Sequence, residues 1–156
     1  MRVTRYTDYG LRVLMYLAVQ DGRRCTIRQI SDAYGISRNH LMKVVQQLAA
    51  LGYVEAVRGV GGGISLARSP GRIRIGAVVV AMEPDLELVE CMRPEGKCVI
   101  SASCRLTGIL GDALQAFIDA LDQSTLADLV EPSAADGLRL LLKLDPVGGP
   151  GDASSA

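Results

Sequence analysis

The fold is decided by the stretch ISDAYGISRNHLMKVVQQLAALGYVEAVRGVGGGISLAR, residues 30–68. The segment Thr26-Ile-Arg-Gln29, just before it, has the pattern of a capping box and predicts the start of a short helix. Gly35 can adopt a positive φ, which allows a tight turn after that helix. Ser37 is then a suitable N-cap for a second helix over residues 38–51. Two helices joined in this way predict a helix-turn-helix.

Two short strands are expected after the second helix. Gly52 ends that helix, and residues 53–58 alternate as a strand. A glycine-rich turn over residues 59–63 leads to a returning strand over residues 64–67. With an amphipathic helix over residues 4–19 in front, this order predicts a winged helix-turn-helix, a mainly α fold with a small β-hairpin wing. Such domains bind DNA, and a small α+β domain without a nucleic-acid role is the alternative.

Charge is divided unevenly along the chain, although the net charge is zero. Residues 1–70 hold ten Lys and Arg against four Asp and Glu, a net charge of +6 (10 − 4), whereas residues 71–156 hold seven against thirteen. A basic part and an acidic part in one chain indicate that the basic part meets a polyanion. We therefore expect double-stranded DNA as a partner of residues 1–70.

The pattern also predicts which residues meet the DNA. In a helix-turn-helix, the first turn of the second helix enters the major groove, where Arg and Asn can read guanine and adenine. The residues expected there are Ser37, Arg38, Asn39, His40 and Lys43. Phosphate or minor-groove contact is expected for Arg28, Arg58, Gly61 and Gly62. Each basic residue, taken singly, can equally be a solvated surface charge.

Composition narrows the class of protein. The hydrophobic fraction of 49% and the charged fraction of 22% are those of a globular chain, with no run of about 20 apolar residues for a membrane helix. Residues 1–20 carry Asp8 and Arg12 inside their apolar pattern, which is typical of an amphipathic helix and not of a signal peptide. We therefore expect a cytoplasmic protein with no membrane partner. The only histidine, His40, lies in the expected recognition helix, so we expect no hydrolytic enzyme.

Three segments are expected along the chain. Residues 1–70 form the winged helix-turn-helix domain, and residues 71–131 hold a cysteine-bearing loop and a long helix. Residues 132–156 are rich in Pro, Ser, Gly and Asp, which favours a flexible tail in which residues 138–144 can form one helical patch.

The long helix is expected to begin near Ser103 and to end near Asp122. It carries an apolar stripe with alternating steps of three and four residues, formed by Leu106, Leu110, Ala113, Leu114, Phe117 and Leu121. The remaining segment is too small to cover this stripe, which favours a partner helix from a second copy. A symmetric homodimer would match a palindromic DNA site.

Three of the four cysteines lie close together in the sequence. Cys91, Cys98 and Cys104 have the spacing C-x6-C-x5-C, which differs from the paired knuckles of a zinc ribbon and from the tight run of bacterial ferredoxins. Thiolates this far apart on a loop can surround a metal cluster. Cys104 is expected in the first turn of the long helix, where the helix dipole favours an anion. A zinc site and three separate buried cysteines are the alternatives, and Cys25 is expected to be structural.

These motifs resemble a known family. The segment MRVTRYTDYGLRVLMYLA, the helix-turn-helix, the wing VGGGISLAR and the three cysteines before a long helix are similar to the winged-helix iron–sulfur transcription regulators of the IscR/NsrR family. The resemblance covers about residues 1–130 and is closest to the branch of repressors that sense nitric oxide. It implies a homodimeric DNA-binding repressor controlled by an iron–sulfur cluster.

The resemblance also implies a ligand set. It implies a [4Fe-4S] cluster held by Cys91, Cys98 and Cys104, with Asp8 of the partner subunit as the fourth ligand and Arg12 beside that carboxylate. The residues alone favour an i, i+4 ion pair of Asp8 and Arg12 near a helix start, the resemblance favours the ligand role, and the two roles are compatible. The IscR-like branch would have a histidine where this chain has Thr107. The alternatives are a [2Fe-2S] cluster, a sensor of iron–sulfur status or redox state, and a zinc-stabilised protein-interaction module.

Overall fold

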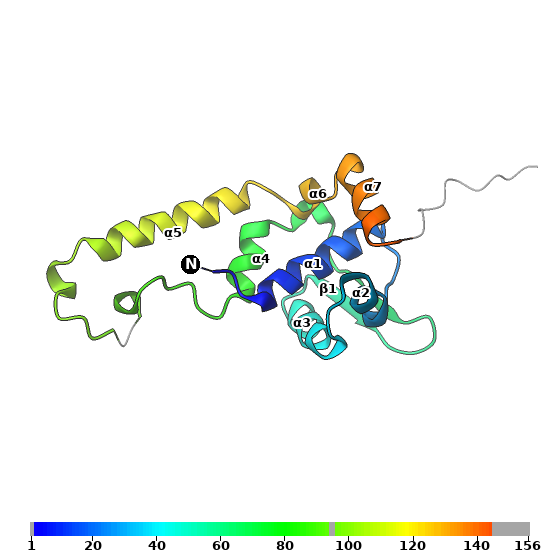
Figure 1. Cartoon of the computed structure of the whole chain (residues 1–156), viewed down its shortest axis with the longest axis horizontal. Coiled ribbons are helices and arrows are strands. Elements are labelled where there is room, and N and C mark those ends of the chain that lie inside the picture. The colour runs from blue at the N-terminus through cyan, green and yellow to red at the C-terminus, as the bar shows by residue number, and fades with distance from the viewer. Residues whose placement is uncertain (1, 94–95, 145–156) are drawn as a thin grey trace, which may run out of the picture.

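The computed structural model describes residues 2–93 and 96–144. In this part of the chain the fold is mainly helical, with one two-stranded antiparallel sheet, as the sequence predicts. Figure 1 shows the elements in order: α1 (Arg5–Val19), α2 (Ile27–Tyr34), α3 (Arg38–Ala50), β1 (Val54–Val57), β2 (Gly63–Leu66), η1 (Pro70–Arg72), α4 (Ile75–Met82), η2 (Glu90–Met92), η3 (Ser101–Ser103), α5 (Leu106–Asp122), α6 (Leu126–Leu129) and α7 (Pro132–Leu141).

Local capping forms the helix-turn-helix, α2 and α3. The Thr26 backbone N–H donates to Gln29 Oε1 at 2.7 Å, and the Gln29 N–H donates to Thr26 Oγ1 at 3.2 Å, which completes the expected capping box. Gly35 ends α2 at φ 65°, and the Ser31 hydroxyl donates to the Ile36 carbonyl at 2.6 Å across the turn. Ser37 occupies the N-cap position of α3, but its side chain makes no capping hydrogen bond.

The wing is a short hairpin tied to the helical body. β1 and β2 pair in register from Val54 with Leu66 to Val57 with Gly63. Next to the hairpin, the Cys25 N–H donates to the Ile64 carbonyl at 2.9 Å, and the Ile64 N–H donates to the Cys25 carbonyl at 2.7 Å. This bridge fixes the wing against the segment between α1 and α2.

The hydrophobic core lies where α1 crosses α3 and α4. The largest fully buried side chains include Leu14, Leu17, Ile30, Leu41, Leu48, Ile73 and Leu126. α4 and α6 therefore share a core with the helix-turn-helix, although they follow it in the sequence. One face of α3 is buried in this core, and its opposite face is exposed to solvent.

Helix α5 leaves this core and extends away from it (Figure 1). Its C-terminal end packs on α4, where the Ala77 N–H donates to Asp122 Oδ1 at 2.8 Å. None of its residues is fully buried. α5 begins at Leu106, so the expectation that Cys104 lies in its first turn is wrong: Cys104 has extended dihedrals after the 3-10 turn η3.

The segment after α6 also differs from the prediction. Residues 132–144, expected to belong to a flexible tail, include α7, which packs on α1. Ala135 is buried, and Arg139 Nε donates to the Val19 carbonyl at the end of α1 at 3.2 Å. Leu142 and Leu144 also pack on the core, whereas Leu140 and Leu141 are exposed, and the ordered helix corrects the prediction for these residues. Residues 145–156 of the predicted tail lie outside the described residues.

Candidate functional site

The exposed face of α3 carries the predicted base-reading residues. Leu41, Val44 and Leu48 are buried on one side of α3. Every residue predicted to face DNA on this helix is exposed, namely Ser37, Arg38, Asn39, His40 and Lys43. Packing of the apolar face of α3 on the core thus keeps its polar first turn at the surface.

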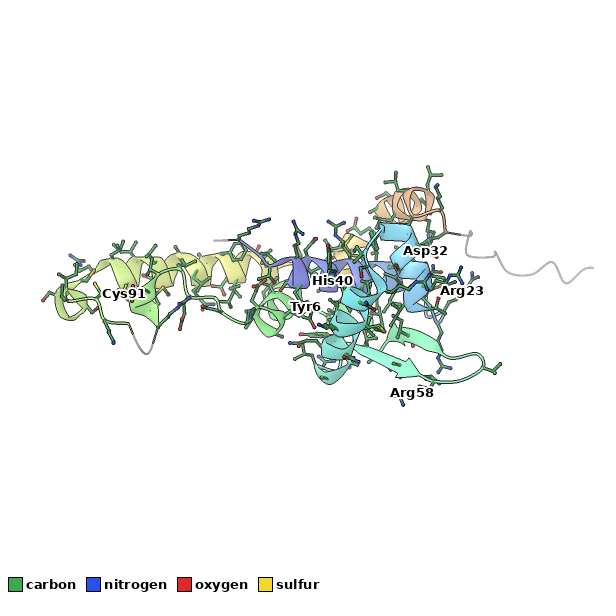
Figure 2. The ribbon with its side chains drawn as sticks, turned by 60° about the horizontal axis from the view of Figure 1, so that its bottom comes forward. Tyr6, Arg23, Asp32, His40, Arg58 and Cys91 are labelled. Carbon is green, nitrogen blue, oxygen red and sulfur yellow. The ribbon has the colours of Figure 1, made fainter. Side chains whose placement is uncertain are left out.

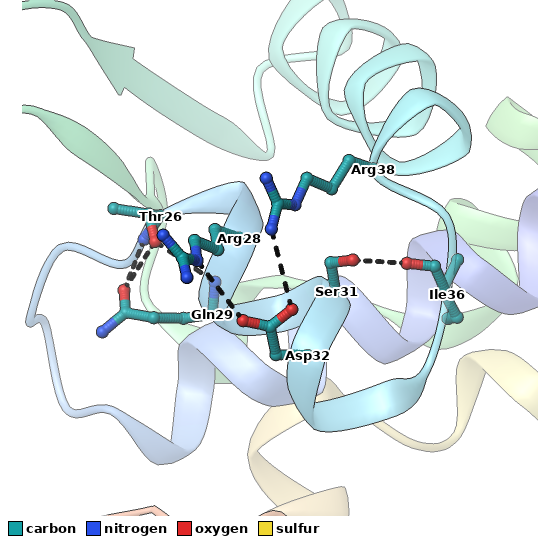
Figure 3. A network of polar contacts seen from close by, with 7 residues as sticks. All are labelled: Thr26, Arg28, Gln29, Ser31, Asp32, Ile36 and Arg38. Carbon is teal, nitrogen blue, oxygen red and sulfur yellow. Dashed lines mark hydrogen bonds and ion pairs between the residues drawn. The ribbon is translucent and has the colours of Figure 1, made fainter.

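One carboxylate joins two of the predicted DNA contacts. Arg28 Nε lies 3.6 Å from Asp32 Oδ2, and Arg38 Nη2 lies 4.0 Å from Asp32 Oδ1 (Figure 3). These side chains are more than half exposed, so the pairs contribute little to stability. Asp32 therefore lies between the two arginines, and its contacts with them are weak. Asp32 was not among the residues predicted from the sequence, although its i, i+4 spacing from Arg28 was a readable signal.

The wing turn requires glycine. Gly61 has a φ of 74°, which favours glycine, and a Cβ on Gly62 would lie 2.8 Å from the Gly59 carbonyl oxygen. Arg58 is exposed beside this turn and lies on the hairpin, apart from His40 (Figure 2). The wing and the first turn of α3 therefore present two separate contact regions.

Asp8 and Arg12 form the expected pair on α1. Arg12 Nε lies 3.1 Å from both carboxylate oxygens of Asp8, and both side chains are nearly half exposed. The Arg12 guanidinium also lies 5.9 Å from the centre of the Tyr34 ring. Asp8 is thus held by its own helix and remains accessible at the surface.

Two of the three clustered cysteines, Cys91 and Cys104, lie at the start of α5. Cys91 and Cys104 are half-buried, Cys98 is exposed, and none forms a disulfide. Cys91 Sγ lies 3.4 Å from the Thr107 hydroxyl in the first turn of α5. Within residues 2–93 and 96–144, no group of three or more His, Cys, Asp or Glu side chains is arranged to hold a metal ion. The thiols fit an iron–sulfur cluster by their chemistry, because they are accessible and unpaired, and Cys91 meets the start of α5.

Arg93 forms two ion pairs that hold the loop beside Cys91. Arg93 Nη2 lies 2.7 Å from Asp85 Oδ2, and Arg93 Nε lies 3.3 Å from Glu87 Oε2. The backbone N–H of Glu87, together with Arg93, holds the pKa of Asp85 below its usual range. These two ion pairs hold Asp85 and Glu87, which precede Cys91, close to Arg93, which follows it. Asp85, Glu87 and Arg93 were not among the site residues predicted from the sequence.

Cys25 differs from the other three cysteines. It is 3% exposed, and burial raises the pKa of its thiol to about 11. Its thiol donates to the Arg23 carbonyl at 3.5 Å, and its backbone forms the bridge to the wing. These contacts are those of a structural residue.

No helix within the described residues is long and apolar enough to cross a membrane.

A helix-turn-helix with a two-stranded wing and an exposed, polar first turn on its second helix defines a winged-helix DNA-binding regulator. Residues 3–132 match the Rrf2 family, described as an iron-dependent transcriptional regulator, and the chain belongs to this family. It is a transcriptional regulator and not an enzyme.

Relatives and solved structures agree with this assignment. The chain is 47% identical over 148 residues to the HTH-type transcriptional regulator NsrR of Halalkalibacterium halodurans, covering 94% of this chain and 100% of the relative. It is 48% identical over 143 residues to NsrR of Bacillus subtilis, covering 90% and 97%. A crystal structure of a transcriptional regulator from Listeria innocua superposes with a TM-score of 0.67 at 28% identity, covering 85% and 88%.

Proposed function

We propose that this chain is a homodimeric transcriptional repressor whose affinity for operator DNA is controlled by an iron–sulfur cluster, with nitric oxide as the signal. The observation that carries this proposal is the set of three free, unburied thiols, two of them at the start of α5, in a chain of an iron-dependent regulator family. The similarity to proteins named NsrR supports the same function. We also propose a cytoplasmic location, where such a repressor would meet its operator DNA.

The proposed ligands come from two subunits. Cys91, Cys98 and Cys104 hold a [4Fe-4S] cluster, and Asp8 of the partner subunit supplies the fourth ligand. The half-exposed carboxylate of Asp8 supports this role, because a buried one would be out of reach of another chain. Arg12 orients that carboxylate through its two contacts at 3.1 Å. When bound, the cluster supplies iron that reacts with nitric oxide.

The second copy of the chain is proposed to cover α5. This helix has 17 residues and none is fully buried, while Leu106 and Ile109 are 54% and 63% exposed. Exposed apolar side chains on an extended helix support association with an equivalent helix. A two-fold dimer presents two copies of α3, which matches a palindromic operator.

DNA recognition is divided between α3 and its surroundings. Arg38 and Asn39 read base edges in the major groove, with Ser37, His40 and Lys43 in the same face. Arg28 contacts phosphate, and Arg58 with the backbone of Gly61 and Gly62 contacts the minor groove or its phosphates. The exposure of all these side chains supports the assignment.

Asp8 connects sensing with DNA binding in this proposal. It lies on α1, which packs on α3, whereas the cysteines lie beside α5. A carboxylate is a weaker ligand for cluster iron than a thiolate, so Asp8 would be the most easily displaced of the four ligands. While Asp8 held the cluster, it would tie the DNA-binding domain of one subunit to the cysteine loop of the other, and loss of this contact would free the domain. The spacing of the two recognition helices then changes.

Anaerobic purification followed by iron and sulfide analysis tests the cluster, and operator selection from random DNA tests binding. Iron and sulfide in the ratio of a [4Fe-4S] cluster, with loss of operator binding on nitric-oxide addition, is the expected result. A [2Fe-2S] ratio, or a response to oxidants alone, would favour a sensor of iron–sulfur status or redox state. Zinc without sulfide and no sequence-specific DNA binding would show a protein-interaction module instead.

A further inference from the structure

A cavity of about 330 Å³ lies between α1 and the recognition helix α3. It is lined by Arg5, Tyr6, Tyr9, His40 and Lys43. Tyr6 and His40 lie near each other in Figure 2, on α1 and on the first turn of α3. The cavity therefore adjoins the surface that is proposed to enter the major groove. Its residues on α1, namely Arg5, Tyr6 and Tyr9, are not among the proposed DNA contacts.

The charge of this cavity favours an anion. Arg5 and Lys43 are exposed cations, and no carboxylate is among the lining residues. Neither cation forms an ion pair within the part of the chain that the structure describes. By contrast, Arg28 and Arg38 both face Asp32. Arg5 and Lys43 can therefore bind an anion without first breaking an ion pair with a carboxylate, unlike Arg28 and Arg38.

The walls of the cavity add apolar surface in a fixed position. The ring centroids of Tyr9 and His40 lie 6.4 Å apart, with 35° between their planes. The Tyr6 hydroxyl donates to the Lys43 carbonyl at 2.7 Å, which joins α1 to α3 at the edge of the cavity. The start of α1 is held in turn by Thr4, whose N–H donates to Glu83 Oε1 at 2.8 Å. The Tyr6 ring is thus held in place before any ligand binds, beside the exposed side chains of Arg5 and Lys43.

We infer that α1 takes part in DNA binding and that this cavity holds the sugar–phosphate backbone beside the recognition helix. Arg5 and Lys43 bind a phosphate, and the rings of Tyr6 and Tyr9 contact the neighbouring deoxyribose. A DNA backbone combines an anion with an apolar sugar, which is the combination that the cavity offers. The strand passes here because its phosphates flank the groove that the first turn of α3 enters. The inference rests on the proposed DNA binding and extends it to α1.

The test is a salt titration of the full chain with a fluorescent duplex of mixed sequence. A phosphate contact is independent of sequence and contributes about 0.9 to the slope of log affinity against log salt concentration. Arg5→Gln should lower the slope by about this amount and weaken every duplex alike. Arg5→Lys should restore most of the slope because it restores the charge. Arg72→Gln is the matched control, since Arg72 is exposed on η1, which packs against α6.

The outcomes separate this inference from the proposed function. A lower slope for Arg5→Gln but not for Arg72→Gln, with unchanged base preference in operator selection, supports the inference. If the wild type binds DNA but Arg5→Gln and Arg72→Gln have equal salt slopes, the inference is overturned. The proposed function is then unaffected. A wild-type chain that binds no duplex at any salt concentration overturns both.

Discussion

Arg12 Nε lies 3.1 Å from each carboxylate oxygen of Asp8, one helical turn earlier on α1. The pair is nearly half exposed, so water screens it and its contribution to stability is small. Its geometry nevertheless fixes the direction of the Asp8 carboxylate. The same contact therefore serves either an ordinary ion pair or a ligand presented to a second subunit, and substitution separates the two roles.

Replacing Asp8 tests the connection between cluster and DNA. Asp8→Ala should still assemble a cluster on three thiolates, yet lose part of the dependence of operator binding on cluster state. Asp8→Cys should hold the cluster more tightly and resist nitric oxide, because a thiolate is the stronger ligand. The measurement is operator binding during an anaerobic nitric-oxide titration. Identical titration curves for the wild type and both variants would show that Asp8 serves only as an ion-pair partner.

The cysteines provide the second prediction. Cys91→Ala, Cys98→Ala and Cys104→Ala should each abolish cluster binding, measured as iron and sulfide per chain after anaerobic reconstitution. Cys25→Ala is the control and should retain the cluster, because that thiol is buried in the core. Circular dichroism would check that each variant is folded. A folded variant of the first three that keeps the full iron and sulfide content would contradict the ligand assignment.

The third prediction separates base reading from phosphate contact. Arg38→Ala or Asn39→Ala should each cost about 1–3 kcal/mol of operator affinity and relax the base preference at one position. Arg28→Ala should weaken all sequences alike and lower the salt slope. Fluorescence anisotropy on the operator and on mixed-sequence DNA measures both effects. Unchanged operator affinity for both α3 variants would place the recognition surface elsewhere.

The fourth prediction concerns the contact between α4 and α5. A Cβ on Gly76 would lie 2.8 Å from the Ile118 carbonyl oxygen and would meet the Asp122 carboxylate. Gly76→Ala should therefore force the two helices apart and lower the free energy of unfolding by about 1–3 kcal/mol. Chemical denaturation measures this loss. Gly108→Ala is the control, because nothing lies within 4 Å of a Cβ at that position, and a similar loss there would refute the packing argument.

The fifth prediction follows from the buried thiol of Cys25. Its pKa is raised from 9.0 to about 11 by burial, so the folded chain keeps a proton that the unfolded chain releases. Stability should therefore be unaffected below pH 9 and should fall by about 2–3 kcal/mol as the pH rises from 9 towards 11. Denaturation of Cys25→Ala over the same pH range should lack this component. An equal pH dependence in both proteins would assign it to other groups.

Alkylation at pH 8 distinguishes the thiols directly. Cys98 is exposed and should react rapidly with iodoacetamide in the cluster-free protein, whereas Cys25 should react only on unfolding. Mass spectrometry of the alkylated peptides gives both rates.

The sequence by itself determined the helix-turn-helix and its wing. The capping box at Thr26 and Gln29, the turn at Gly35 and the end of α3 at Gly52 all act within a few residues along the chain. Such signals depend on backbone hydrogen bonds and on φ, so they can be read without knowledge of the fold. The amphipathic pattern of α3 likewise identified the exposed face on which Arg38 and Asn39 lie.

Only the tertiary structure decided how distant segments meet. α7 is held against α1 by the buried side chain of Ala135 and by the hydrogen bond from Arg139 to the Val19 carbonyl, and this contact joins residues more than 100 positions apart. The proximity of Cys91 to Thr107, the position of Asp32 between two arginines, and the cavity between Arg5 and Lys43 have the same origin. Side-chain contacts across elements follow from the packing of the whole core, and no local pattern records them.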